Sequence, residues 1–110
     1  LESLGAEQEH ALESSLRVLL VHLLKWRWQA ARRSRSWRTT IVRERLSVPR
    51  RLRRNPGLRP KLATLLADAY ADARKEAAAE TGLALNRFPT ISPFTLEQAL
   101  DEAFWPERAE

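Results

Sequence analysis

Residues 12–26 read LESSLRVLLVHLLKW, and this stretch decides the fold. Apolar side chains recur along it at steps of three and four residues, which is the period of one face of an α-helix. The pattern predicts a helix over residues 7–30. Val18, Val21 and Trp28 lie off the main stripe. The second half of this helix is therefore apolar nearly all round, which is typical of a helix at the centre of a core or under a partner.

The next segment predicts a second helix that begins with Ser36 as its N-cap. Trp37, Ile41, Val48 and Leu52 repeat at helical spacing and share one face. Pro49 lies inside this pattern, and proline both removes an amide donor and crowds the preceding turn. We therefore expect a kink or a break near residues 46–48.

Two more helices are expected downstream. The third has Asn55 as a possible cap and runs to about residue 81, where Gly82 is a natural C-terminal cap. A loop over residues 83–94 leads to a short fourth helix, in which Thr95 and Gln98 have the spacing of a capping box. Pro106 is expected to end it.

The fold class that follows is all-α, with three to four helices in an antiparallel, bundle-like arrangement and the first helix central. A chain of 110 residues fits a single helical domain over residues 1–110. Because it begins at Leu1 rather than Met, we expect it to lack an N-terminal helical segment. The longest apolar stretch, residues 18–24, is broken by His22 and is too short to span a bilayer, and cysteine is absent. We therefore expect a cytoplasmic protein that does not engage a membrane.

Charge is distributed unevenly along the chain. Residues 25–61, here called the basic segment, hold fourteen lysines and arginines against one acid, Glu44, which gives +13. Residues 1–24 carry −3 and residues 62–110 carry −5. A basic block between acidic flanks either binds an anion or pairs with its own flanks, and the sequence leaves both alternatives open.

Two sets of residues are candidate sites. The first is an anion site at a loop-to-helix junction, where forked guanidinium donors meet a helix N-terminus; it comprises Lys25, Arg32, Arg33, Arg35 and Arg38. The second is an interface made of Val18, Val21 and Trp28, which a second copy or a partner protein would cover. In the competing interpretation the basic segment is a solvated helix that pairs with acids such as Glu13, Asp68 and Asp72. Along a helix its arginines scatter widely and predict no single stripe.

Catalytic chemistry has little support. The chain has no cysteine, only three glycines and no nucleophile motif. Glu7 and His10 have the spacing of a helical metal motif, but the second copy that such sites need is missing. We predict no cofactor and no metal. An enzyme would have to use His22, Lys25 and Arg38, with Tyr70, around a pocket.

Several motifs are similar to those of a bacterial family known as domain of unknown function number twenty-nine. They are HLLKWR at residues 22–27, RSRSWRTTI at residues 33–41, ETGL at residues 80–83, PFTLEQ at residues 93–98 and FWP at residues 104–106. The resemblance covers nearly the whole chain and implies an all-α bacterial protein, usually with an extra N-terminal helical segment. It implies no activity. Pro49 interrupts a helix that the family usually keeps continuous, and Ser92 stands where a cysteine often precedes the proline.

The function hypothesis that we rank first is a non-catalytic helical interaction module, which forms a homodimer or binds a partner protein. The alternative is a domain that binds phosphate or nucleic acid through the basic segment. An enzyme is the third possibility.

Overall fold

The computed structural model describes residues 2–110, with side chains from residue 5 onward. Four α-helices follow one another: α1 (Glu2–Trp28), α2 (Arg35–Arg54), α3 (Leu62–Thr81) and the short α4 (Leu96–Leu100). Short 3-10 helices lie at Ala30–Arg32, Pro56–Lys61 and Leu85–Arg87. No strand occurs in the described residues, so the predicted all-α class is confirmed.

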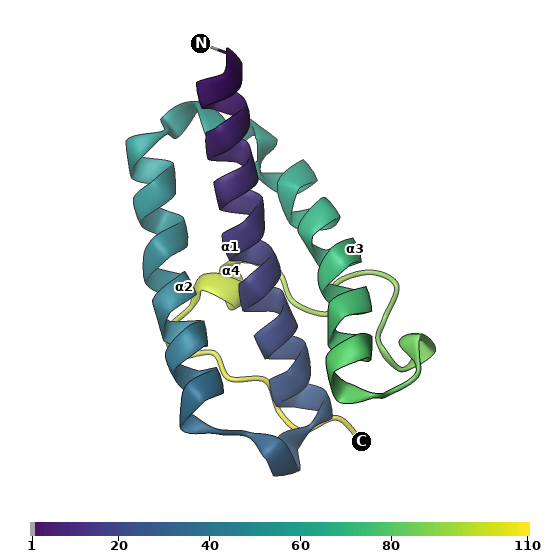
Figure 1. Ribbon diagram of the computed structural model, residues 1–110. Helices are drawn as coiled ribbons and strands as arrows, with labels where there is room; N and C mark the ends of the chain where they lie inside the picture. Colours follow the sequence, from purple (N-terminus) through teal and green to yellow (C-terminus); the bar gives the residue numbers. More distant parts are fainter. Residues whose placement is uncertain (1) are drawn as a thin grey trace.

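Helix α1 lies between α2 and α3 and packs against both, as the sequence predicted for a central helix (Figure 1). Consecutive long helices run antiparallel, so α3 runs in the same direction as α1. The segment after α3, which contains α4, crosses behind the three long helices in this view. The charged helices α2 and α3 are therefore held apart by α1.

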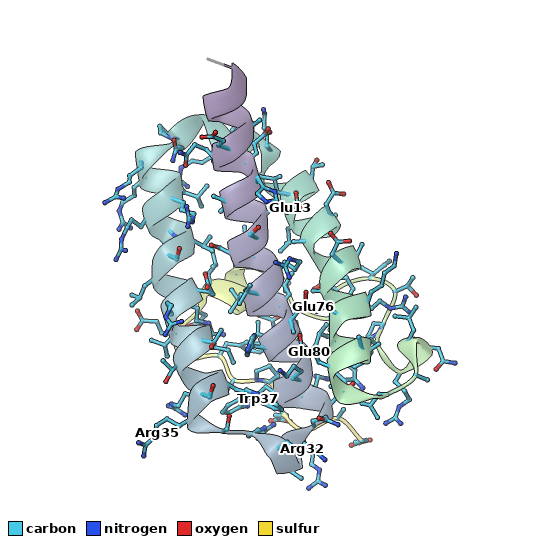
Figure 2. The ribbon with its side chains drawn as sticks, viewed as in Figure 1. Glu13, Arg32, Arg35, Trp37, Glu76 and Glu80 are labelled. Carbon is cyan, nitrogen blue, oxygen red and sulfur yellow. The ribbon has the colours of Figure 1, made fainter. Side chains whose placement is uncertain are left out.

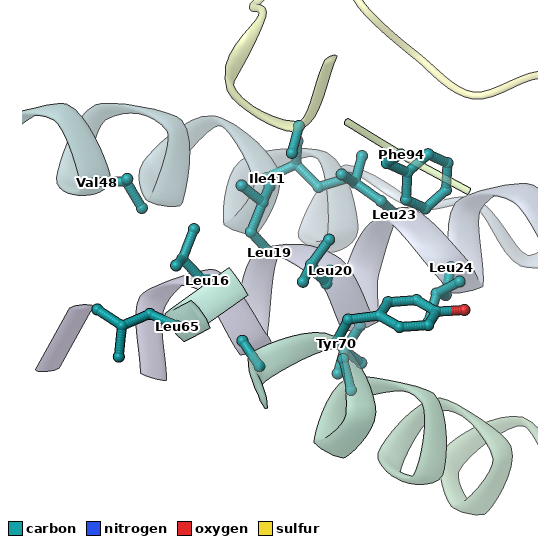
Figure 3. Close-up of a cluster of buried hydrophobic side chains, with 14 of the residues drawn as sticks. Leu16, Leu19, Leu20, Leu23, Leu24, Ile41, Val48, Leu65, Tyr70 and Phe94 are labelled. Atoms are coloured by element: carbon teal, nitrogen blue, oxygen red, sulfur yellow. The ribbon is translucent and has the colours of Figure 1, made fainter. Parts of the chain in front are cut away.

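The core forms where the apolar stripe of α1 meets its neighbours (Figure 3). Leu16, Leu20 and Leu23 of α1 are fully buried. Burying a leucine side chain contributes about 1.5–3 kcal/mol relative to leaving it in water. The other helices and the C-terminal segment supply the rest of the core, including Ile41, Val48, Leu65, Tyr70, Phe88 and Phe94. Burial of this one continuous cluster holds α2 and α3 against α1.

Helix α2 differs from the prediction in two ways. It begins at Arg35, and its N-cap is Ser34 rather than Ser36, because the Ser34 side chain accepts a hydrogen bond from the backbone N–H of Trp37. The helix also continues through Pro49, so the predicted break near residues 46–48 is wrong. A proline inside a helix costs about 3 kcal/mol. Burial of Val48 and Leu52 on the core side, before and after the proline, offsets that cost.

The ends of the other helices also shift. Asn55 caps a 3-10 helix over Pro56–Lys61 and not α3, which begins only at Leu62. Gly82 ends α3 in the left-handed conformation, with φ at 75°, as predicted. The capping box of Thr95 and Gln98 is also confirmed. Helix α4 nevertheless ends at Leu100 and not at Pro106, because Arg45 takes up the carbonyl of Ala99 in its last turn and that of Phe104 beyond its end.

Candidate anion-binding face

The outward side of α2 carries a row of arginines. Ile41, Val48 and Leu52 turn one side of this helix toward the core, so the opposite side faces solvent. Six arginines of α2 are exposed, and we call them the arginine face: Arg35, Arg38, Arg43, Arg50, Arg53 and Arg54. With eight arginines and one glutamate, α2 has a formal charge of +7, whereas α3, with four acids and two bases, has −2. The sequence predicted no single stripe, but packing against α1 leaves these six side chains on the solvent side.

The five residues of the predicted anion site do not come together as one site. The ammonium of Lys25 is buried, 2.8 Å from Glu80 Oε1, and lies 4.6 Å from the ring centre of Trp37. Arg33 donates to the backbone carbonyls of Trp26, at 2.8 Å, and Pro106, at 3.0 Å. Lys25 and Arg33 are therefore structural.

The other three members of that predicted site, like Arg33, are exposed. Arg32 and Arg35 lie on the outside of the molecule near the turn between α1 and α2 (Figure 2). Arg38 is exposed as well, and its guanidinium stacks on the ring of Trp105 at 4.6 Å. Of the five, Arg35 and Arg38 thus belong to the arginine face, and Arg32 lies near its start.

The acidic side chains that form ion pairs serve the contact between α1 and α3. Arg17 pairs with Glu76, and Lys25 pairs with Glu80. Lys61, just before α3, pairs with Glu9 of α1 at 2.8 Å. Glu76 and Glu80 lie between these two helices, on the far side of α1 from the arginine face (Figure 2). Within the described residues no ion pair joins the arginine face to any acid, including Glu13, Asp68 and Asp72. Internal pairing therefore does not account for this face.

The side chains expected for an enzyme are held by internal contacts. Burial lowers the pKa of His22, whose Nδ1 lies 2.8 Å from the backbone carbonyl of Val18. Burial opposes the ionisation of Glu80, but the hydrogen bond and the charge of Lys25 outweigh it and lower its pKa. Tyr70 donates to the carbonyl of Pro89, and burial raises its pKa. His22 and Tyr70 thus each contact a backbone carbonyl, and Glu80 pairs with Lys25.

Arg45 is a structural residue that the sequence analysis missed. It is 4% exposed and donates to the carbonyls of Ala99 at 2.8 Å, Phe104 at 2.7 Å and Gln98 at 3.3 Å. Burial lowers its pKa, against the charges of Asp101 and Glu102. A signal was present in the sequence, since position 45 lies four residues after Ile41 and three before Val48, on the apolar stripe.

A shallow groove of about 290 Å³ runs beside the arginine face. Trp105 forms part of it, with the guanidinium groups of Arg38 and Arg45 4.6 Å and 5.2 Å from its ring centre. Val42 and Leu46 line the same groove and are 45% and 53% exposed. The arginine face therefore has an apolar strip within it.

The predicted interface residues on α1 are covered to different extents by the chain itself. Val21 is fully buried, and Trp28 is half-buried with its ring 5.3 Å from that of Phe88. Val18 is half-buried. Among the described residues, the large apolar side chains that are exposed lie outside α1, at Val42, Leu46, Leu85 and Ile91. The exposed apolar side chains thus lie on α2 and on the segment after α3 rather than on α1.

Comparison with known proteins places the chain in one family. A family model described as Domain of unknown function DUF29 matches residues 1–105. No curated protein and no solved structure matches the chain. In the part of the chain that the structure describes, no helix has both the length and the apolar character to cross a membrane. In the same part, no three histidine or acidic side chains gather as a metal site would require.

Proposed function

Because the chain belongs to the DUF29 family, whose description assigns no activity, we propose a function from the geometry: the arginine face binds the phosphate backbone of nucleic acid. One observation carries the proposal. Six exposed arginines lie along one helix, and no acid in the described residues pairs with them. Guanidinium groups match phosphate oxygens in geometry and stay charged at every physiological pH.

The dimensions of α2 suit this role. Arg35 and Arg54 are nineteen residues apart on one helix, a length of about 28 Å at 1.5 Å per residue. Such a helix can follow several successive phosphates of a strand. Contacts to phosphates position a protein but carry no base information. We therefore expect binding with little sequence preference, in the bacterial cytoplasm, where nucleic acid is accessible.

A titration of labelled oligonucleotides tests the proposal. We expect the protein to bind both a duplex and a single strand in fluorescence anisotropy at 50 mM salt. If about four to five phosphates are neutralised, affinity for the duplex should fall roughly 10²- to 10³-fold between 50 and 200 mM salt. The absence of binding to either oligonucleotide at 50 mM salt would refute the proposal.

A second candidate function is a protein-interaction module, and the exposed pair Val42 and Leu46 favours it. An apolar strip flanked by arginines suits an amphipathic helix with acidic edges. Its source is either another protein or a second copy of this chain. Polyglutamate in the same titration separates the two functions. If the protein binds polyglutamate with the same affinity as the oligonucleotides, charge attraction alone explains the binding and phosphate is not recognised. A loss of partner binding in Val42→Ser/Leu46→Ser, with oligonucleotide binding unchanged, would assign the strip to a protein.

A further inference from the structure

A cleft of about 370 Å³ lies between the N-terminal half of α1 and the C-terminal end of α2. These two segments lie side by side in Figure 1, where the teal end of α2 approaches the purple part of α1. We call it the arginine cleft, and six side chains line it: Gln8, Ser47, Arg50, Arg51, Arg54 and Asn55. Three of them are guanidinium groups, three are neutral polar groups, and none is a carboxylate.

Internal hydrogen bonds fix the walls of the cleft. The Nε of Arg51 donates to Ser15 Oγ at 3.3 Å, which anchors this half-buried side chain against α1. The side-chain amide of Asn55 donates to Gln8 Oε1 at 3.3 Å and to the carbonyl of Arg51 at 3.1 Å. The cleft is thus largely formed before a ligand arrives, which reduces the ordering cost of binding.

The C-terminal end of a helix carries a partial negative charge from its free carbonyls, and this charge opposes anion binding. Here the carbonyl of Arg51 accepts two donors, the backbone N–H and the side-chain amide of Asn55. That capping weakens the opposing charge. The guanidinium groups of Arg50, Arg51 and Arg54 then dominate the potential in the cleft.

We propose that the arginine cleft binds a doubly charged phosphate group, either as free phosphate or as the terminal phosphate of a nucleic-acid strand. Forked donors recognise such a group by several charge-assisted hydrogen bonds at once. An exposed side of a helix can follow internal phosphates, whereas a cleft admits the end of a strand. The strand-end form rests on the proposed function, since Arg50 and Arg54 belong to both the cleft and the arginine face.

Two probes test the cleft, and two matched variants share the same loss of charge. The probes are inorganic phosphate, followed through the amide signals of Ser47 and Asn55, and a single strand with a 5′-phosphate compared with its 5′-hydroxyl form. The variants are Arg50→Gln/Arg54→Gln and, as the control, Arg35→Gln/Arg43→Gln. All four positions are exposed, so both variants should keep the fold, as circular dichroism will verify.

We expect the 5′-phosphate to strengthen binding about fivefold, which corresponds to part of one charge-assisted hydrogen bond. Arg50→Gln/Arg54→Gln should abolish this preference for the 5′-phosphate strand over the 5′-hydroxyl strand, together with saturable binding of inorganic phosphate. The control should weaken the binding of both strands equally and keep the fivefold preference for the 5′-phosphate strand. Equal loss in both variants, or no effect of the 5′-phosphate and no saturation by inorganic phosphate, would overturn the cleft.

The cleft and the proposed function fail separately. If both strands bind with equal affinity and inorganic phosphate does not saturate, the cleft is refuted and the nucleic-acid function stands. If inorganic phosphate saturates the cleft but no strand binds, the cleft stands and the nucleic-acid function is refuted.

Discussion

Reversing three charges of the arginine face, with Arg43→Glu, Arg50→Glu and Arg53→Glu together, is expected to weaken duplex binding at least about 100-fold at low salt. Each of these side chains is exposed, and none forms an ion pair within the described residues. The substitution therefore removes phosphate contacts and adds repulsion without breaking internal contacts. Anisotropy at 50 mM salt measures the effect, and thermal unfolding checks that the fold is intact.

A control with the same change in net charge separates local contacts from overall charge. Lys75, Arg87 and Arg108 are also exposed and lie outside α2. Their joint replacement by glutamate lowers the net charge by the same amount. We expect this control to weaken binding only a few-fold, since it leaves the phosphate contacts in place. An equal loss in both triple variants would show that only net charge matters.

Replacing Arg45 with methionine is expected to destabilise the protein by about 3 kcal/mol. Methionine keeps much of the apolar stem but leaves the carbonyls of Ala99 and Phe104 without the Arg45 donor, whereas that of Gln98 keeps the backbone N–H of Asp101. The variant no longer buries a guanidinium charge, and this gain offsets part of the lost stability. Thermal unfolding should show a midpoint lower by roughly 10–15 °C.

Arg43→Met is the matched control for this prediction. Arg43 lies on the same helix, two residues earlier, and is exposed. Its replacement should change the free energy of unfolding by less than about 0.5 kcal/mol. Hydrogen exchange in residues 96–104 should accelerate in Arg45→Met only. Equal stability of the two variants would contradict the role of Arg45 as a clamp on the C-terminal segment.

The sequence predicted the features of the fold that local chemistry sets. The leucine stripe of α1, the glycine after α3 and the capping box of α4 each depend on neighbouring residues, and all three are confirmed. The break expected at Pro49 was wrong because the effect of a proline depends on packing, and α2 stays helical on both sides of Pro49 where Val48 and Leu52 are buried. Arg45 ends α4 earlier than Pro106 would, by a contact across more than fifty residues.

The candidate site was less accessible to sequence reasoning. The excess of arginine was visible, and so was its position between acidic flanks. Which basic side chains are free depends on tertiary contacts. Lys25 pairs with Glu80, and Arg33 donates to two backbone carbonyls. Arg43 and Arg53 face solvent and make no such contact in the described residues. The arginine cleft needs Gln8 and Asn55 to meet, and no local pattern predicts that contact.

The most direct test of the arginine face is its footprint by nuclear magnetic resonance. A short duplex is titrated into ¹⁵N-labelled protein at low salt, and arginine Nε–H signals are followed with the backbone amides. We predict saturable shifts at Arg35, Arg43, Arg50 and Arg53, with the signals of α3 unchanged. Shifts concentrated on α3 or on the groove between α1 and α3, or no localised shifts at saturating duplex, would contradict the account.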